Sequence, residues 1–328
     1  MSIKIKSLKL ENYCGYRDSL FDFTDIDGSI KPIALLFGPN GDGKSNLLYG
    51  IDVLGNVQRH SGRDTTMLFR KMTFHPDYNP TYEGFYASSE SMRITGVFCV
   101  ENENEKRDAE VLITTKGVEK NELPIKDGLD GPSCHTYLID ADKESERRKF
   151  LLHAEKIDQF RDLAKIVYDC NIGVGNEIVD LYGTDEAYYT NFWLEKHDGS
   201  KVHFKRMSDG ERKIAKLLTS LCDPIWMPNI DIIMIDNIAM HIYFKRHKDL
   251  MDKLLDTFPE KQFVATTHSG IIVEHIDKNF CYDIERYKKD EIKRLGKVNP
   301  DKYSGKNLDP DFIDRLVLLS QEIDNNEN

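Results

Sequence analysis

The first quarter of the chain contains short apolar runs that are typical of strands. Residues 3–10 alternate between apolar and polar positions with one slip in phase, which predicts a strand with a bulge. Residues 20–23 are typical of its partner strand, reached through a turn at Gly15. The run 33–37 is apolar throughout and ends at Gly38, as expected of a strand buried on both faces. The chain therefore starts with two different kinds of strand.

Helical and strand patterns then alternate along the rest of the chain. Apolar residues recur at helical spacing over residues 46–57, 142–170, 208–222 and 245–257. Further strands are expected at 92–100, 109–115, 202–206, 230–235 and 262–266. This order predicts an α/β fold with an antiparallel lobe around residues 92–115. No heptad pattern persists, so long coiled-coil arms are not expected.

Composition limits the class of protein. The chain has 328 residues, of which 40% are hydrophobic and 31% are charged, a balance typical of soluble globular proteins. No stretch approaches the roughly 18 apolar residues of a membrane span, and the N-terminus does not have the pattern of a signal peptide. The six cysteines lie far apart, which argues against a zinc site or a disulfide framework. These features predict a cytoplasmic protein.

The net charge weighs against a dedicated nucleic-acid binder. The chain has 45 Lys and Arg residues against 56 Asp and Glu residues, which gives a formal charge of −11. Proteins that bind nucleic acid through their whole surface are usually basic. Any DNA contact must therefore come from a local basic cluster.

The strongest chemical signal is the octapeptide from Gly38 to Ser45, which fits the pattern GxxxxGK[ST] at every position. It follows an expected strand and opens an expected helix, which is the context that this motif requires. Its glycines let backbone N–H groups curl around phosphate oxygens, and the helix N-terminus adds a positive dipole end. Lys44 is expected to reach the β- and γ-phosphates, and the Ser45 hydroxyl to bind Mg²⁺.

Three weaker signals follow the phosphate loop. The apolar run 230–235 ends in Asp236, and an acid at the end of a buried strand can hold Mg²⁺ or simply cap a turn. Ser208 and Gly210 open a helix whose N–H groups could face an anion, but Ser208 with Glu211 also fits an ordinary capping box. The strand 262–266 leads to His268, which could bond a γ-phosphate or be structural.

The order of these four signals resembles that of ABC-type ATPases of the SMC, RecF and OLD group. The opening segment from Ile5 to Tyr13, with Gly15, Tyr16 and Arg17, is similar to the first strand and turn of that group. The resemblance covers residues 1–58 and about 200–285. Within the group, the chain looks most like the compact ATPase subunits of bacterial antiphage systems of the PARIS or Septu type.

The resemblance implies a fold, a domain order and a set of site residues. It implies an α/β ATPase head with residues 1–135 as its first part, 136–200 as a helical insert, 201–285 as its second part and 286–328 as an extension. The residues it implies for ATP binding are Gly38, Asn40, Gly41, Gly43, Lys44, Ser45, Asn46, Ser208 and Gly210. Ser45 and Asp236 would hold Mg²⁺, and His268 would be the switch histidine.

The resemblance also implies a way of working. Two copies would dimerise head to head around ATP, with Ser208 and Gly210 of one copy facing the nucleotide of the other. The dimer would control a separate effector, such as a nuclease or toxin, in antiphage defence. The glutamine that such ATPases place near the metal has no convincing match, because Gln58 comes too early and Gln159 falls in a helical segment.

One departure from the group concerns the residue after Asp236. The group usually has Glu there as the base that polarises water, whereas this chain has Asn237, followed by Ala239 where some relatives have a second acid. Asn237 can orient a water molecule but cannot take its proton. Hydrolysis would then be slow, or the base would come from elsewhere, or one of the two residues would be an engineered replacement.

Two alternative functions stay open. A DNA-repair ATPase of the RecF type would bind DNA directly, through basic clusters such as 59–63, 70–71, 245–248 or 288–297. A small-molecule kinase would need arginines in a lid and would not need the Ser208 helix. For each of these basic clusters, a solvated surface is the simpler interpretation.

Overall fold

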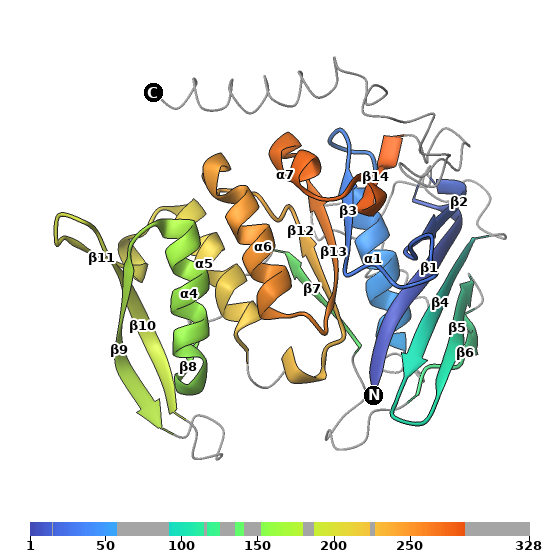
Figure 1. Ribbon diagram of the computed structural model, residues 1–328, viewed down its shortest axis with the longest axis horizontal. Helices are drawn as coiled ribbons and strands as arrows, with labels where there is room; N and C mark the ends of the chain where they lie inside the picture. Colours follow the sequence, from blue (N-terminus) through green and yellow to red (C-terminus); the bar gives the residue numbers. More distant parts are fainter. Residues whose placement is uncertain are drawn as a thin grey trace, which may run out of the picture. The chain divides into compact units, whose positions relative to one another are not determined.

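A computed structural model describes residues 1–14, 16–57, 92–114, 117–124, 135–140, 152–179, 187–223 and 227–285 (Figure 1). Gln58, the basic clusters within 59–71 and 288–297, the turn at Gly15 and the C-terminal extension lie outside the described residues. The chain divides into two compact units. The first comprises Met1–Leu138, Ile230–Asp236 and Glu260–Asn328, and the second comprises Ile139–Asn229 and Asn237–Pro259.

The first unit contains an antiparallel sheet that confirms the expected N-terminal lobe. Its strands are β1 (Ser2–Tyr13), β2 (Tyr16–Asp22), β4 (Arg93–Glu101), β5 (Lys106–Thr114) and β6 (Gly117–Asn121). They lie in the order β2-β1-β4-β5-β6. The register of β1 against β4 shifts between Ile5 and Ser7, which confirms the expected bulge. At this bulge the Gln262 side chain bonds both backbone groups of Ile5: it accepts from Ile5 N at 2.7 Å and donates to Ile5 O at 3.0 Å.

A second, five-stranded sheet brings distant parts of the sequence together. Its strands are β3 (Ile33–Phe37), β7 (Thr136–Asp140), β12 (Ile232–Asp236), β13 (Gln262–Thr267) and β14 (Cys281–Asp283). Their order is β14-β3-β13-β12-β7, and the β14–β3, β3–β13 and β13–β12 pairs are parallel. All five residues of β3 are buried, as expected of a strand in a parallel sheet. The short helix α7 (Gly270–His275) follows β13.

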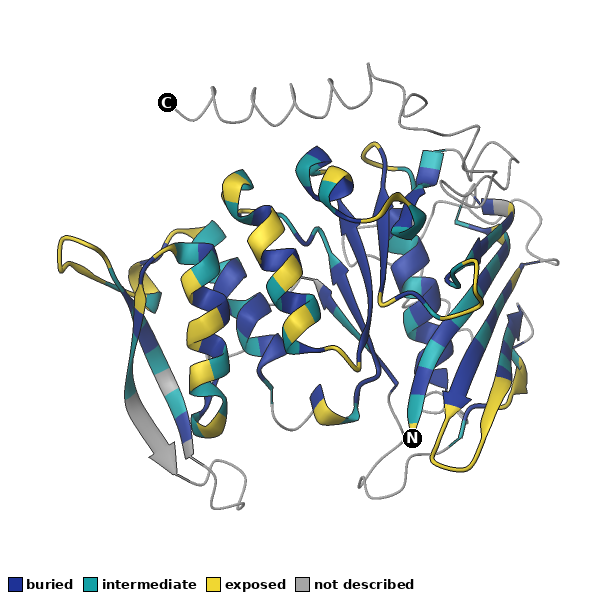
Figure 2. Cartoon of the chain, in the orientation of Figure 1, coloured by how far each residue is buried: buried dark blue, intermediate teal, exposed yellow. Residues whose placement is uncertain are grey.

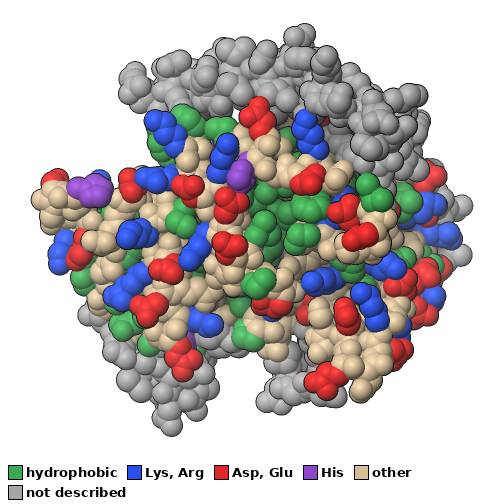
Figure 3. Space-filling view, in the orientation of Figure 1, with side chains coloured by type: hydrophobic (Ala, Val, Ile, Leu, Met, Phe, Trp, Pro, Cys, Tyr) green, Lys and Arg blue, Asp and Glu red, His purple; other side chains and the backbone are tan. Residues whose placement is uncertain are grey.

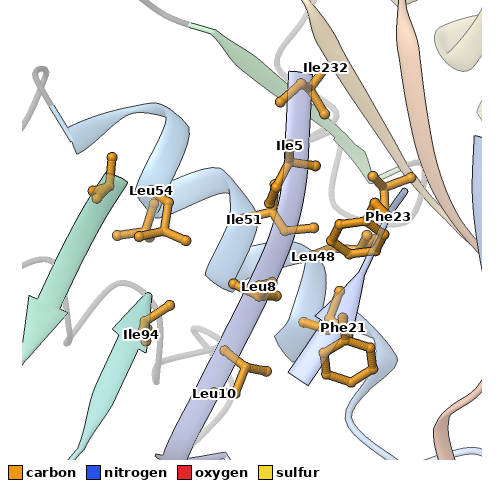
Figure 4. Packing of buried hydrophobic residues seen from close by; sticks show 14 of the residues in the cluster. Ile5, Leu8, Leu10, Phe21, Phe23, Leu48, Ile51, Leu54, Ile94 and Ile232 are labelled. Atoms are coloured by element: carbon orange, nitrogen blue, oxygen red, sulfur yellow. The ribbon is translucent and has the colours of Figure 1, made fainter. Parts of the chain in front are cut away.

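Helix α1 (Lys44–Gly55) lies between the two sheets of the first unit and contacts β4 and β5 as well as β12 and β13. Figure 4 shows Leu48, Ile51 and Leu54 of this helix among side chains of β1, β2 and β4. These residues belong to one buried apolar cluster that packs the helix against both sheets.

The described residues of the second unit form three α-helices and a small antiparallel sheet. The helices are α4 (Ile157–Tyr168), α5 (Asp209–Leu221) and α6 (His247–Thr257). The strands are β8 (Leu152–His153), β9 (Asn171–Val179), β10 (Ala187–Glu195) and β11 (Lys201–His203). Short 3₁₀ turns span Ala154–Lys156, Phe204–Arg206, Met227–Asn229, Phe244–Arg246 and, in the first unit, Lys278–Phe280. Figure 2 shows buried and exposed residues along α4 and α6, whereas α5 is buried or intermediate after Asp209.

The expectation of a helical insert over 136–200 was wrong in its secondary structure. Within the expected helix 142–170, only Ile157–Tyr168 is α-helical, residues 152–153 form a strand, and 141–151 lie outside the described residues. The segments 171–179 and 187–195 pair as strands, because aromatic and β-branched residues pack well on a pleated surface. Trp193 lies across Gly173, its cross-strand neighbour, where any Cβ would overlap the indole. Likewise, the expected strand 202–206 ends at His203.

The remaining expected elements that fall on described residues are confirmed, with ends that differ by at most four residues. Among the described residues the longest helix is α5, with 13 residues. In the same part of the chain, no helix has the length and apolar character needed to cross a membrane.

Candidate functional site

The carboxyl ends of three parallel strands meet at one edge of the second sheet. Phe37 at the end of β3 pairs with Thr267 of β13, and Ile235 of β12 pairs with Ala265. Gly38 and His268, which follow β3 and β13, and Asp236, the last residue of β12, therefore lie at the same edge of the sheet. Ligands of open α/β sheets bind outside this end of the strands, so we call this part of the first unit the strand-end site.

The phosphate loop has the local structure that its sequence predicts. It leaves β3 at Phe37, and α1 begins at Lys44. The Lys44 ammonium donates to Gly38 O and to Pro39 O, both at 2.7 Å, and this residue is only 6% exposed. A buried cation is thus held inside the loop by the loop's own carbonyl groups, where a phosphate would be bound.

The start of α1 is held by the hairpin of β1 and β2. Gly43 caps the helix with φ 90°, a conformation that suits glycine. The Tyr16 hydroxyl donates to Gly43 O at 3.0 Å, and the Tyr13 hydroxyl donates to Asn46 O at 3.1 Å. Burial raises the pKa of the Tyr16 phenol, and the neighbouring Asp42 raises it further. Tyr16 therefore remains a hydrogen-bond donor at any physiological pH.

Asp236 is oriented by the neighbouring strand. The Thr266 hydroxyl donates to Asp236 Oδ1 at 2.5 Å. Thr266 is fully buried, whereas Asp236 is half-buried at the strand end. A carboxylate held in place by a hydrogen bond from a neighbouring side chain is suited to hold a divalent cation.

His268 lies within electrostatic reach of both groups. Loss of hydration lowers the pKa of its imidazole, and the positive charge of Lys44 lowers it further, while Asp236 opposes the shift. His268 as a whole is still exposed, so its ring is reached by solvent. The imidazole is consequently neutral at pH 7 and can donate one hydrogen bond to an anion.

In the second unit, the start of α5 forms a capping box. Glu211 N donates to Ser208 Oγ at 3.3 Å, while the Glu211 carboxylate accepts from Ser208 N and from the Ser208 hydroxyl, each at 2.8 Å. The alternative interpretation of this motif as an N-cap is therefore confirmed. Tyr168 of α4 ties this turn to the rest of the unit, because its hydroxyl donates to Glu211 O at 2.5 Å.

The loop after Asp236 contains two residues in the left-handed region, Asn237 (φ 55°) and His241 (φ 63°). Backbone bonds close it, from Met240 N to Asn237 O at 2.9 Å and from Ile242 N to Ala239 O at 3.2 Å. The His241 side chain lies against Gly210: a Cβ on Gly210 would meet three of its atoms at 3.1 Å. The loop and the start of α5 therefore touch directly within the second unit.

The structure thus places the expected site residues in two groups. Lys44, Asp236 and His268 meet at the strand-end site, with Ser45 and Asn46 in the first turn of α1 and with Asn40 and Gly41 exposed in the loop. Ser208, Gly210, Asn237 and Ala239 belong to the second unit. Gln159 lies on α4, also in the second unit. Within the described residues, no group of three or more His, Cys, Asp or Glu could hold a metal ion by itself. A Mg²⁺ ion at Ser45 and Asp236 would therefore need phosphate oxygens as further ligands.

Sequence reasoning missed three contacts of the site: Tyr16 on Gly43, Thr266 on Asp236, and His241 on Gly210. For Thr266 a signal existed, because a polar residue near the end of an apolar strand needs a partner. For the other two, the partners are 27 and 31 residues apart, and only the fold brings them together.

Comparisons with known proteins bear on the fold and on distant relationship. No family model matches the chain. It is 24% identical over 290 residues to the Septu protein PtuA of Bacillus mycoides (strain KBAB4), which covers 81% of this chain and 38% of that protein. It is 24% identical over 138 residues to the retron Vc95 probable ATPase of Vibrio cholerae serotype O1 biovar El Tor, covering 39% of this chain and 25% of that protein. The chain thus spans less than two fifths of the length of either relative.

Two solved structures share the fold. One is an SmcHead bound to the C-winged helix domain of ScpA, with a TM-score of 0.52, 14% identity, and coverage of 83% of this chain and 92% of the other. Another is the Smc head domain with an extended coiled coil, bound to the C-terminal domain of ScpA, from Pyrococcus furiosus. It gives a TM-score of 0.51, 14% identity, and coverage of 84% and 92%. The resemblance that the motifs predicted is confirmed: the chain has the α/β fold of SMC-type ABC ATPase heads and is a distant relative of a Septu protein and of a retron probable ATPase.

Proposed function

We propose that this chain binds ATP and Mg²⁺ at the strand-end site and that two copies join around the bound nucleotide. The observation that carries the proposal is the meeting of Lys44, Asp236 and His268 at the ends of three parallel strands. Lys44 and the first N–H groups of α1 would hold the triphosphate, because the N–H groups of a helix's first turn are not used by the helix itself.

The metal would be held by the Ser45 hydroxyl and by Asp236, the carboxylate that Thr266 orients. Mg²⁺ supplies positive charge that offsets the charge developing on the transferred phosphate. The His268 imidazole would donate a hydrogen bond to the terminal phosphate. All of these residues belong to the first unit.

Hydrolysis at this site is expected to be slow. Asn237 follows Asp236 directly, and an amide can orient a water molecule but cannot accept its proton. Replacing Asn237 by Glu should raise turnover by about 10²-fold or more, the usual contribution of a positioned general base. Ala239→Glu is the matched variant at the other candidate position. No gain with either variant would mean that the missing acid does not limit the reaction.

The Ser208–Gly210 tip is the part that would act on the nucleotide of a second copy. It opens a helix end at which Ser208 and Asp209 are exposed, and the N–H groups of such an end suit an anion. The Ser208 hydroxyl now donates to the Glu211 carboxylate, so it would have to turn from Glu211 to a phosphate. ATP binding by one copy would thus assemble the tip of the other.

The joined form would act as a scaffold or sensor for a separate effector, such as a nuclease, in antiphage defence. The support for this step is the distant relation to a Septu protein and to a retron probable ATPase. Mass measurement in solution tests the assembly: with ATP and Mg²⁺ the chain should form a dimer or higher oligomer, and with ADP or no nucleotide it should not. An unchanged mass in a nucleotide-saturated sample would exclude ATP-driven assembly.

Direct DNA binding remains the second candidate function. The net charge of −11 gives it no support, and Figure 3 shows Lys and Arg side chains interspersed with Asp and Glu over the face that it displays. Tight, salt-dependent DNA binding by the purified chain alone would reverse this ranking.

A further inference from the structure

The first turn of α1 is held by two tyrosines from the same hairpin. Tyr13 and Tyr16 are register partners across the β1–β2 pair, and both are buried. Each hydroxyl donates to one carbonyl of the segment that starts the helix, Tyr16 to Gly43 O at 3.0 Å and Tyr13 to Asn46 O at 3.1 Å. The two bonds are alike in length and both are partly buried, but they act on different peptide groups.

The peptide group that Tyr16 contacts is the one that presents the Lys44 N–H. In a trans peptide the C=O and the N–H point in opposite directions, and none of the described peptide bonds is cis. Gly43 O receives two bonds, from the Tyr16 hydroxyl and from Leu47 N, each at 3.0 Å. With its carbonyl fixed toward the hairpin and the helix, this peptide must direct the Lys44 N–H the other way, toward the phosphate loop.

The ring of Tyr16 adds a steric constraint to the same peptide. A Cβ on Gly43 would lie 3.3 Å from Tyr16 Cε2 and from its hydroxyl oxygen. The ring thus packs directly on the glycine that turns the chain into α1. The contact fixes both the position and the rotation of this peptide.

Tyr13 acts on a peptide with a different task. The N–H of the Asn46–Leu47 peptide belongs to Leu47, and it is used in the helix ladder, where it donates to Gly43 O. Losing the Tyr13 bond therefore removes one buried hydrogen bond without turning an N–H that faces the loop. Tyr13→Phe is therefore a matched control for Tyr16→Phe.

We propose that Tyr16 is a positioning residue of the nucleotide site, whose hydroxyl aims the Lys44 N–H at the phosphates, whereas Tyr13 only stabilises the fold. The proposal rests on the ATP binding proposed above. Neither tyrosine is expected to touch the nucleotide itself. Their difference should therefore be seen in nucleotide affinity and not in stability.

The experiment compares Tyr16→Phe with Tyr13→Phe in the full chain. Binding of ADP and of Mg²⁺–ATP is measured by calorimetry, and the thermal midpoint is measured without nucleotide. Tyr16→Phe should weaken both nucleotides about 3- to 10-fold, the equivalent of one hydrogen bond, and Tyr13→Phe should change affinity less than twofold. Both variants should lower the thermal midpoint by similar amounts.

Two results would overturn the proposal: affinity within twofold of the unchanged chain for a folded Tyr16→Phe, or equal losses in both variants. Should Tyr16→Phe not fold, the ¹⁵N–¹H signal of Lys44 in the unchanged chain decides instead. It must shift strongly when ADP is added, and its failure to shift also overturns the proposal. Two further measurements distinguish failure of the proposed function from failure of this inference. If the unchanged chain binds no nucleotide, the proposed function is refuted. If Lys44→Ala abolishes binding but Tyr16→Phe does not weaken it, only this inference is refuted.

Discussion

The strand-end site of the first unit and the Ser208–Gly210 tip of the second are built in opposite ways. The strand-end site joins segments that are more than 190 residues apart in sequence, through the pairing of β3 with β13 and of β13 with β12. The tip is built within four residues, by the capping box of Ser208 and Glu211. One depends on the whole fold, whereas the other is formed by its own helix turn, against which Tyr168 and His241 are packed.

The difference extends to burial and to how each group is held. Lys44 and Thr266 are buried, and each is fixed by a bond to a residue of the same site. Ser208 is exposed, and its hydroxyl donates to the Glu211 carboxylate in a capping box that contributes about 1 kcal/mol. The strand-end site is thus arranged before any ligand arrives, whereas the tip can exchange its partner at small cost.

The largest expected effect is that of Lys44→Ala on nucleotide binding. Removing the ammonium that would pair with the phosphates should cost about 3 kcal/mol or more, which is over 100-fold in Kd. Calorimetric titration with Mg²⁺–ATP measures it. Lys6→Ala is the matched control, because Lys6 forms a surface ion pair with Asp108 at 2.6 Å in the same unit. A Lys44→Ala chain that binds within tenfold of the unchanged chain would place the triphosphate elsewhere.

The strand-end site could be predicted from sequence because each of its parts has a local signal. The apolar run 33–37, the glycine-rich loop and the run 230–236 ending in an acid each indicate their own structure. Their meeting follows from parallel pairing, since parallel strands place their carboxyl ends at one edge. The capping box could also be predicted from sequence, because its two residues are three positions apart.

The segment 171–195 could not be predicted in the same way. Its strands β9 and β10 contain Gly173, Gly175 and several polar residues, so apolar and polar positions alternate only weakly along them. The helical pattern of the α4 residues that precede them therefore suggested a helical insert. What fixes the pair is the packing of Trp193 across the glycines, a contact between residues 18 and 20 positions apart. The bond from Tyr16 to Gly43 was missed for the same reason, because it depends on the finished fold.

The second largest effect should separate assembly from nucleotide binding. Ser208→Arg places a long side chain at the tip, so ATP-dependent association should weaken by about 30-fold or more, the equivalent of about 2 kcal/mol. Nucleotide affinity of the single copy should stay within twofold, because the tip belongs to the other unit. Sedimentation with and without ATP measures the first, and calorimetry the second. Asp198→Arg, at an exposed turn of the second unit, is the control that should change neither.

A smaller effect is expected from Thr266→Val, which keeps the shape of the side chain and removes the donor to Asp236. The carboxylate loses its fixed orientation, so the affinity for Mg²⁺–ATP should fall about 3- to 10-fold, while the affinity for ATP in the presence of EDTA should not change. Thr267→Val is the matched variant, because the Thr267 hydroxyl accepts from Ser269 N at 3.0 Å and does not contact Asp236. Equal effects of both substitutions on metal-dependent binding would show that Thr266 has no orienting role.

The smallest effect concerns pH and uses one histidine from each unit. Burial lowers the pKa of His247 in the second unit, against the opposing effect of the Ile242 and Ala239 carbonyls, and loss of hydration lowers the pKa of His268 in the first. A folded-state pKa below 6.5 means that the unfolded chain binds more protons. The stabilisation is therefore complete above pH 6.5 and decreases as the pH falls through the folded-state pKa.

Bound nucleotide should change the pH response of one histidine and not of the other. A triphosphate beside His268 favours the charged imidazole and raises its pKa, so the loss of stability on acidification that His268 causes should disappear when ATP is bound. His247, which belongs to the other unit and bonds Ile242 O at 2.8 Å, should respond to pH in the same way with or without ATP. Thermal midpoints between pH 5 and 8 for His268→Gln and His247→Gln, each with and without ATP, measure this. If ATP changed the pH response of the His268→Gln chain as much as that of the unchanged chain, the charge that ATP brings would not lie beside His268, and the strand-end site would lose its proposed ligand.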